Sequence, residues 1–327
     1  MKKHTWVATL GLCSLLAAVN VALPAGAQEL ASQVLALYPP QTGELVFVDL
    51  QSARRSPHYA RLKAQALPER YHDLERWSAQ LGVDFERNVD RVSWAFISRG
   101  DAASSDFVGV AEGAFYLDEI QRTAAASQLR TLAYRGASVY WLGENEAGRE
   151  FIFAFPDNAR LVFGFREAVQ EMLDRAAQGG PSLLDNAQMR GLVEQVNRRA
   201  SIWIVLDGEF TQLGVRQFLG QAAEVPGAET LAQRVQTASL RMELNRGLDT
   251  TLAARCASAT DALWFSTFLE GALYFQRQRL NESNPALARI LGDARLQRAG
   301  DEISLAVAIS ESDMPALLQA RSFTLSF

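Results

Sequence analysis

The chain has 327 residues, 48% of them hydrophobic and 21% charged, and its formal net charge is −5. This composition is typical of a globular protein that is long enough to form one large domain or two smaller ones. The acidic balance disfavours non-specific nucleic-acid binding, which requires a positive surface that displaces counterions from phosphates.

The first 27 residues have the pattern of a cleaved export signal. Lys2 and Lys3 precede an apolar stretch, Trp6–Val21, and the small residues Ala25–Ala27 match a signal-peptidase site. Polar residues interrupt the apolar stretch, which disfavours a membrane anchor. We therefore predict cleavage after Ala27, a periplasmic or secreted location, and no transmembrane anchor in the remaining chain.

Cysteine is scarce. Cys13 follows Leu12 in the middle of the apolar stretch, not at its end where a lipoprotein cysteine stands. After the signal, Cys256 is the only cysteine, so the cleaved chain cannot form an intramolecular disulfide. Because Cys256 ends a predicted apolar strand, Leu252–Cys256, we expect a buried core residue and not a nucleophile.

Residues 28–90 are predicted to form a helical N-terminal region with one strand. The apolar run Glu44–Leu50 is typical of a buried strand. Helices are expected over Leu30–Tyr38, from Ser56 onward, and over Pro68–Leu81, where apolar residues recur at helical spacing.

Residues 91–207 are predicted to form a first α+β sub-structure. Arg91–Ser98 alternates large apolar with small or polar residues, which is the period of a strand with one buried face. The elements expected after it are strand Phe107–Ala114, helix Tyr116–Ala126, strands Ser138–Leu142, Glu150–Phe155 and Arg160–Phe165, helices Arg166–Gln178 and Asn186–Asn197, and strand Ser201–Leu206.

Residues 208–327 are predicted to form a second α+β sub-structure. Its long helix begins after Ser258 and runs to about Leu280. Apolar residues cover more than half of the circumference of this helix, so we expect it to be buried on most sides. The other expected elements are helices Gln212–Ala223 and Glu229–Thr237, strands Ser239–Asn245, Thr250–Cys256, Arg295–Arg298 and Glu302–Ile309, and helix Met314–Arg321.

The order strand-strand-helix-strand-strand-helix occurs twice, at about 91–178 and 239–321. Hairpins outnumber crossover connections, which favours antiparallel pairing. We therefore predict an α+β fold with largely antiparallel sheets, helices on one face, and a possible two-fold internal repeat.

Known catalytic and cofactor motifs are missing from the sequence. It contains no phosphate-binding glycine loop, no G-x-S-x-G or S-x-x-K nucleophile motif, and no calcium loop. His58, His72 and Cys256 are too few for the standard zinc sites. We therefore predict no cofactor and no metal, and assign no catalytic residue.

Two acidic patterns leave alternatives open. Glu69-x-x-His72 has the spacing of iron ligands on one helix face, but the second copy that such a site needs is missing, so a solvated face is favoured. Asp49 and Asp207 each end an apolar strand. Such carboxylates can act as acid and base in a hydrolase, although capping of the following turn is the favoured interpretation.

Aromatic residues are concentrated on adjacent predicted strands and on the long helix. The four candidate ligand-binding residues are Trp94 and Phe153 on the strands and Trp264 and Phe268 on the helix. We expect these four residues to line a cavity for an apolar ligand if the sheet wraps around the helix. A well-filled hydrophobic core is the alternative, and it is favoured.

Three short motifs carry a family resemblance. They are Leu37–Pro40 leading into Leu45–Asp49, Leu81–Asp84 before Asp90–Val92, and Phe163-Gly164 before a helix. Together they resemble secreted bacterial proteins classed as domains of unknown function. The resemblance implies no catalytic residues.

Together these observations favour an exported, non-enzymatic envelope protein that binds a protein partner or an apolar small molecule. The first alternative is a carboxylate-dependent hydrolase that acts on envelope polymers. The second is an outer-membrane-associated component, because the C-terminal residues Phe323–Phe327 alternate and end on phenylalanine.

Overall fold

The computed structural model describes residues 29–66, 69–100, 105–144, 148–198, 200–219 and 228–319. The predicted signal, 1–27, and the alternating C-terminal residues, Phe323–Phe327, lie outside these ranges. Among the helices that are described, none is both long and apolar enough to cross a membrane.

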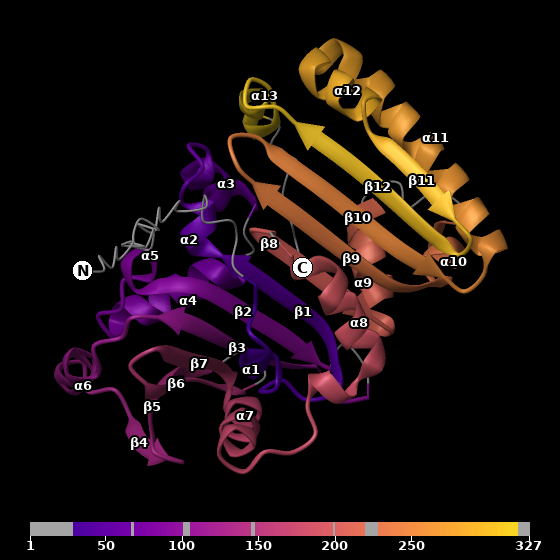
Figure 1. Ribbon diagram of the computed structural model, residues 1–327. Helices are drawn as coiled ribbons and strands as arrows, with labels where there is room; N and C mark the ends of the chain where they lie inside the picture. Colours follow the sequence, from indigo (N-terminus) through magenta and orange to yellow (C-terminus); the bar gives the residue numbers. More distant parts are fainter. Residues whose placement is uncertain are drawn as a thin grey trace, which may run out of the picture.

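Twelve strands form one sheet in the order β11-β12-β10-β9-β8-β1-β2-β3-β7-β6-β5-β4 (Figure 1). Every neighbouring pair is antiparallel. The predicted α+β class with antiparallel pairing is therefore confirmed.

Strands β1 (Thr42–Asp49) and β8 (Ile202–Asp207) pair at the centre of the sheet. The side that starts at β1, called here the N-terminal half, continues through β2 (Val89–Ile97), β3 (Asp106–Gly113), β7 (Arg160–Phe165), β6 (Glu150–Asp157), β5 (Ala137–Glu144) and β4 (Thr131–Tyr134). The side that starts at β8, the C-terminal half, continues through β9 (Val235–Leu244), β10 (Leu248–Cys256), β12 (Glu302–Ile309) and β11 (Arg295–Ala299).

The strands of the two halves follow the same order away from the centre. It is β1-β2-β3-β7-β6 on one side and β8-β9-β10-β12-β11 on the other, and β5 and β4 extend the first series. Strand β1, from the predicted N-terminal region, lies between β2 and β8, which both come mainly from the first predicted sub-structure. The two series include β1 and β8, which lie outside the predicted repeat at about 91–178 and 239–321, so that repeat stays a prediction.

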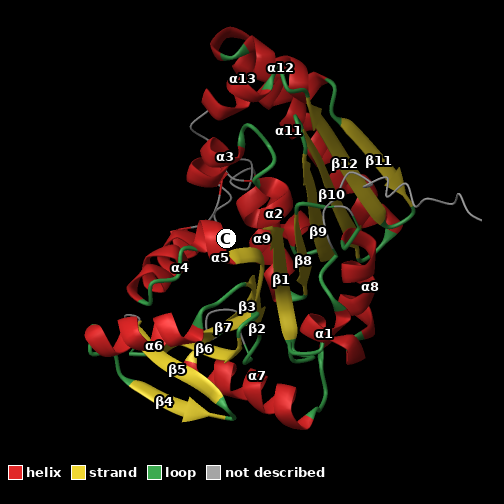
Figure 2. Ribbon diagram, turned by 60° about the vertical axis from the view of Figure 1, so that its left-hand side comes forward, coloured by secondary structure: helices red, strands yellow, loops and turns green. Residues whose placement is uncertain are grey.

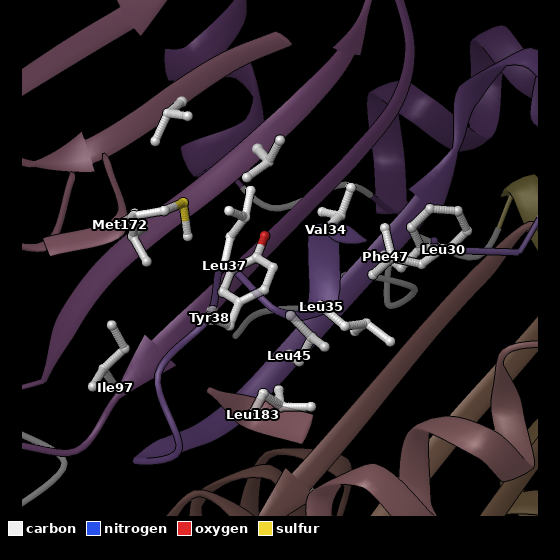
Figure 3. Close-up of a cluster of buried hydrophobic side chains, with 14 of the residues drawn as sticks. Leu30, Val34, Leu35, Leu37, Tyr38, Leu45, Phe47, Ile97, Met172 and Leu183 are labelled. Atoms are coloured by element: carbon white, nitrogen blue, oxygen red, sulfur yellow. The ribbon is translucent and has the colours of Figure 1, made fainter. Parts of the chain in front are cut away.

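In the N-terminal half, helices cover both faces of the sheet. Because side chains alternate along a strand, Leu45 and Phe47 of β1 lie on one face and Val46 and Val48 on the other. The first face is covered by α1 (Ser32–Leu35), α7 (Arg166–Gln178) and α8 (Ala187–Val196), and Figure 3 shows part of that core. The second is covered by α2 (Leu50–Ala53), α4 (Glu69–Gln80), α5 (Phe85–Asn88), α6 (Leu117–Ala126) and α9 (Glu209–Leu219).

In the C-terminal half, the predicted arrangement with helices on one face holds for β10–β12. Leu248, Ala254 and Cys256 of β10 point to the covered face. The helices on that face are α10 (Ala228–Ala232), α11 (Ala259–Ser283), α12 (Pro285–Gly292) and α13 (Met314–Gln319), together with α3 (Tyr59–Ala66) at one end. Figure 1 shows α11 passing behind β11 and β12, and Figure 2 shows the half from the side.

The opposite face of β10 and β12, called here the open face, carries small and polar side chains. Thr251 and Ala253 of β10 pair with Ala306 and Ser304 of β12, and all four are partly exposed. Arg255 pairs across the same face with Glu302. Among the described residues, no helix packs on this part of the sheet. Its composition is that of a solvated sheet face.

Candidate functional site

The structure does not bring the four predicted cavity residues together. Trp94 on β2 and Phe153 on β6 share one buried cluster of the N-terminal half. Phe268 on α11 packs against a different cluster in the C-terminal half, and Trp264 is 61% exposed. Helix α11 packs on β10, β11 and β12, the strands that flank it in the sequence.

Trp94 and Phe153 belong to a filled core. Phe153 packs against Phe151 and Phe163 with ring centroids 6.2 Å apart in each case. Phe107 packs against Phe163 at 6.0 Å. Such edge-to-face and tilted pairs are the usual packing of aromatic side chains in a core. This geometry supports the core interpretation of the strand aromatics.

The predicted carboxylate pair is not assembled. Asp49 and Asp207 end two antiparallel neighbours, β1 and β8, and therefore lie at opposite ends of the central pair. Asp49 accepts a hydrogen bond from the backbone N–H of Ser52 at 2.9 Å, so the predicted capping role is confirmed. Asp207 accepts one from Nε2 of Gln188 at 2.6 Å, and partial burial raises the pKa of its carboxyl.

The residues around His72 form an ion network between helices. Lys63 of α3 forms ion pairs with Glu75 of α4 and Glu86 of α5. Nδ1 of His72 lies 3.3 Å from a carboxylate oxygen of Glu75. The side chain of Glu69 is outside the described part. Within that part, no group of three or more His, Cys, Asp or Glu side chains is placed to hold a metal ion.

A shallow recess lies between β10, β12 and α12. Its volume is about 400 Å³, and its lining includes Asp249, Asp293 and Glu311. Arg289 and Asp313 also line it and pair with each other. None of the four predicted cavity residues reaches it.

Helix α11 begins as its sequence predicts. Ser258 caps it by accepting a hydrogen bond from the backbone N–H of Asp261 at 3.1 Å. On its buried side, Ala262, Phe265 and Leu269 pack into the same cluster as Ala254 and Cys256 of β10. Cys256 is a buried free cysteine, as expected, and burial raises the pKa of its thiol to about 11.

The opposite side of α11 exposes large apolar side chains. Leu263 is 47% exposed, Trp264 61%, Tyr274 58% and Phe275 70%. They are four of the seven large hydrophobic side chains that are exposed in the described part. The expectation that this helix is buried on most sides is therefore wrong. Its apolar residues lie on two opposite faces, and the described residues bury one of them.

These exposed residues lie on one side of the helix. At about 100° per residue, Trp264, Phe268, Gly271 and Phe275 follow one another along α11. Leu263 and Tyr274 lie about 80–100° around the axis from Trp264, and the exposed Thr267 lies between the two rows. These six residues are called here the aromatic face. No charged residue falls within it, because Asp261, Glu270, Arg277 and Arg279 lie on its flanks. Tyr274 and Phe275 pack edge to face at 6.1 Å.

Trp264 and Phe268 are predicted from the sequence as site residues, whereas Leu263, Tyr274 and Phe275 are not. The signal that finds them is the absence of charge from 263 to 275 on one helix face, considered separately from the face that carries Ala262, Phe265 and Leu269. Counting apolar residues around the whole circumference of the helix does not distinguish its buried face from its exposed one.

Comparison with known proteins gives distant similarities only. No family model and no curated protein matches the chain. Crystal form I of TP0453 is similar over 88% of this chain and 96% of that chain, with a TM-score of 0.49 and 10% sequence identity. Crystal form IV of TP0453 covers the same shares, with a TM-score of 0.48 and 12% identity. Neither similarity assigns a role to the aromatic face.

Proposed function

We propose that this protein is an exported, non-enzymatic binding protein, and that another protein docks on the aromatic face of α11. The observation that carries this proposal is the gathering of Leu263, Trp264, Tyr274 and Phe275 on one uncharged face, where each is 47–70% exposed. Isolated exposed apolar side chains are ordinary, whereas a contiguous group marks an interaction surface.

The residue types fit the core of a protein interface. Tryptophan and tyrosine are enriched among the residues that dominate binding energy, and charged residues are depleted there. Trp264 and Tyr274 lie near opposite ends of the aromatic face, and Asp261 and Arg279 lie outside it. Covering apolar area contributes about 25 cal/mol per Å², so docking would stabilise these side chains.

The helix is also well supported. Its other side is anchored by Phe265 and Leu269, which are 2% and 3% exposed. A rigid docking element loses little conformational freedom on binding, which favours affinity. The aromatic face is therefore presented by a fixed scaffold and not by a loop.

The shape of this surface favours a protein over an apolar small molecule. Small-molecule sites are concave and enclose most of their ligand. The aromatic face is one side of a helix, and the predicted cavity residues Trp94 and Phe153 lie in another cluster. A helix side of this kind fits a groove or a second helix of a partner protein. The predicted export signal supports an envelope location for that partner.

Site-specific photo-crosslinking in cells tests the proposal. A photoreactive residue at position 275 is expected to form a defined covalent adduct, and Trp264→Glu on the same chain should abolish it. Position 116 is the matched control, because Tyr116 is 62% exposed but lies on the N-cap of α6. Equal adducts from positions 116 and 275, or no adduct from 275, would refute a docking role for the aromatic face.

A further inference from the structure

We propose that the protein docked on the aromatic face is a second copy of this chain, whose own α11 packs antiparallel against the first. This inference rests on the proposed docking role of that face and names its partner. The two helices would be related by a two-fold axis through their contact, so that each buries the aromatic face of the other. Such isologous pairing is closed and stops at two subunits.

Large apolar side chains lie at similar distances from the midpoint of the aromatic face toward each end of α11. Trp264 and Phe275 stand at equal distances from a centre between Leu269 and Glu270, and the distances of Leu263 and Tyr274 from that centre differ by two residues. An antiparallel pairing about that centre sets Trp264 opposite the partner's Phe275, and Leu263 beside the partner's Tyr274. Each contact then occurs twice, so all four exposed large side chains are used.

The middle of the face has complementary shapes. The same centre sets Phe268 opposite the partner's Gly271. A Cβ built at Gly271 meets no atom within 4 Å, so this position faces open space and leaves a notch in the helix surface. A large side chain opposite a notch allows two helices to approach to the usual 8–10 Å.

One flank of the helix carries complementary charges in this arrangement. Asp261 and Arg279 lie on the same flank of α11, each about 60° around the axis from Trp264. A two-fold axis across antiparallel helices brings identical flanks together, so Asp261 lies beside the partner's Arg279 and the reverse. Glu270 lies on the other flank, about 20° around the axis from Leu263, and the same two-fold axis places it near the partner's Glu270.

The ends of the helix also favour the antiparallel direction. Glu282 continues the row of Trp264 and Phe275, and the pairing brings it near the start of the partner's α11, where a carboxylate is stabilised by the helix dipole. In a parallel pairing, Trp264 would lie opposite the same tryptophan of the second chain. That pairing also keeps Asp261 about 27 Å along the axis from either Arg279.

The size of the contact predicts a moderate affinity. Stable interfaces bury roughly 800 Å² per partner. The aromatic face runs about 18 Å along one helix, from residue 263 to residue 275, and covers less than that. We therefore expect a dimer whose dissociation constant is on the order of 10 µM.

Sedimentation equilibrium of the exported chain, between about 1 and 200 µM, is the first test. The mass is expected to rise toward twice that of the monomer. Trp264→Ala and Phe275→Ala should each weaken the dimer by at least ~10-fold, because each removes the two contacts between Trp264 and Phe275 of opposite copies. Tyr116→Ala is the matched control and should leave the association unchanged.

Cysteine crosslinking tests the direction of the helices. Chains with Trp264→Cys and Phe275→Cys are mixed, oxidised with copper-phenanthroline, and compared with each chain alone. The mixture should give a disulfide-linked dimer, whereas two copies of position 264 stand about 16 Å apart along the axis and should not react. The natural Cys256 is buried and does not compete.

The outcomes separate this inference from the proposed function. A dimer crosslinked mainly through 264 to 264 overturns the antiparallel arrangement. A chain that stays monomeric at 200 µM, but whose position 275 crosslinks a different protein in cells, overturns the second copy and leaves the docking role standing. A monomer that instead co-floats with phosphatidylglycerol–phosphatidylcholine vesicles through Trp264 overturns both.

Discussion

The two halves of the sheet share a strand order and differ in what covers them. In the N-terminal half, β3 presents Val108 and Val110 to one helix layer and Phe107 to the other. In the C-terminal half, β10 presents Thr251 and Ala253 to the open face. The aromatic residues differ in the same way, because they pack inside the first half and gather on the outside of α11 in the second. The same strand order is thus covered by helices on both faces in the N-terminal half, whereas in the C-terminal half β10–β12 are covered on one face by α11, whose outer side is exposed.

The largest expected difference between the halves concerns their aromatic residues. Phe153→Ala removes a ring that is fully buried in the N-terminal half and should lower the free energy of unfolding by about 3–5 kcal/mol. Trp264→Ala removes an exposed ring and should change it by less than ~0.5 kcal/mol at low protein concentration. Urea unfolding followed by circular dichroism measures both. Similar losses in the two variants would contradict the comparison.

Two glycines provide a second contrast. A Cβ at Gly109 of β3 would lie 2.3 Å from Phe163 and 2.6 Å from the backbone oxygen of Ser93. Gly109→Ala should therefore destabilise the protein by about 3 kcal/mol, because a paired strand cannot move aside. Gly271→Ala, on the exposed side of α11, should stabilise it by about 0.5–1 kcal/mol through helix propensity. Thermal melts of dilute protein distinguish the signs, and a loss at both positions would show that α11 is more constrained than its exposure indicates.

The two sheet faces can be compared by exchanging valine and threonine. Val110→Thr puts a hydroxyl into the covered face of β3, where Val110 is 1% exposed, and should cost about 2 kcal/mol. Thr251→Val on the open face removes a hydroxyl that water can solvate, and should change stability by less than ~0.5 kcal/mol. Chemical denaturation of the pair provides the test. A large effect of Thr251→Val would mean that something covers the open face.

The smallest expected difference concerns acid stability. Partial burial alone would raise the pKa of Glu86, but hydrogen bonds and charge from Lys63 and Arg54 lower it. This carboxylate therefore contributes stability above its unfolded pKa, and that contribution is lost as the pH falls through its lowered folded pKa. Glu86→Gln should flatten the loss of stability between about pH 5 and pH 3, by less than ~1 kcal/mol because the network is partly exposed.

The control for this titration lies on the open face. Glu302 pairs with Arg255, and both side chains are about half exposed. Glu302→Gln should leave the stability at pH 7 within ~0.5 kcal/mol of the natural chain, as for most surface ion pairs. Unfolding curves at pH 7 and pH 3 compare the two variants. A steeper acid response in Glu86→Gln than in the natural chain would contradict the role given to Lys63.

Local sequence signals predicted most of the helices and strands. They did not predict how these elements are arranged in the sheet. Strands β9 and β10, the start of α11 after Ser258 and the capping role of Asp49 depend on neighbouring residues, and the structure contains all of them. Strand β4, Thr131–Tyr134, was not predicted, because a short exposed edge strand has no buried face to set its period. The helix expected over Glu229–Thr237 is shorter, since β9 already begins at Val235.

The candidate site shows the same division. Trp264 and Phe268 were recognisable as unusual from their residue types, but their neighbours depend on which strands α11 covers. Helix α11 packs on β10, β11 and β12, and the strand order of the sheet places these strands away from β2 and β6, which carry Trp94 and Phe153. The sequence offers no local signal for this strand order.

The central pairing of β1 with β8 also bears on how the chain reaches its fold. Leu45 pairs with Val205, so the contact joins segments about 160 residues apart. Contacts between such distant segments form slowly, because a long loop must close before they are made. Until β8 is in place, the first half has β1 as a bare edge, rich in Leu45–Val48, that can pair with another chain. Folding is therefore expected to pass through a period of aggregation risk that ends when β1 and β8 have paired.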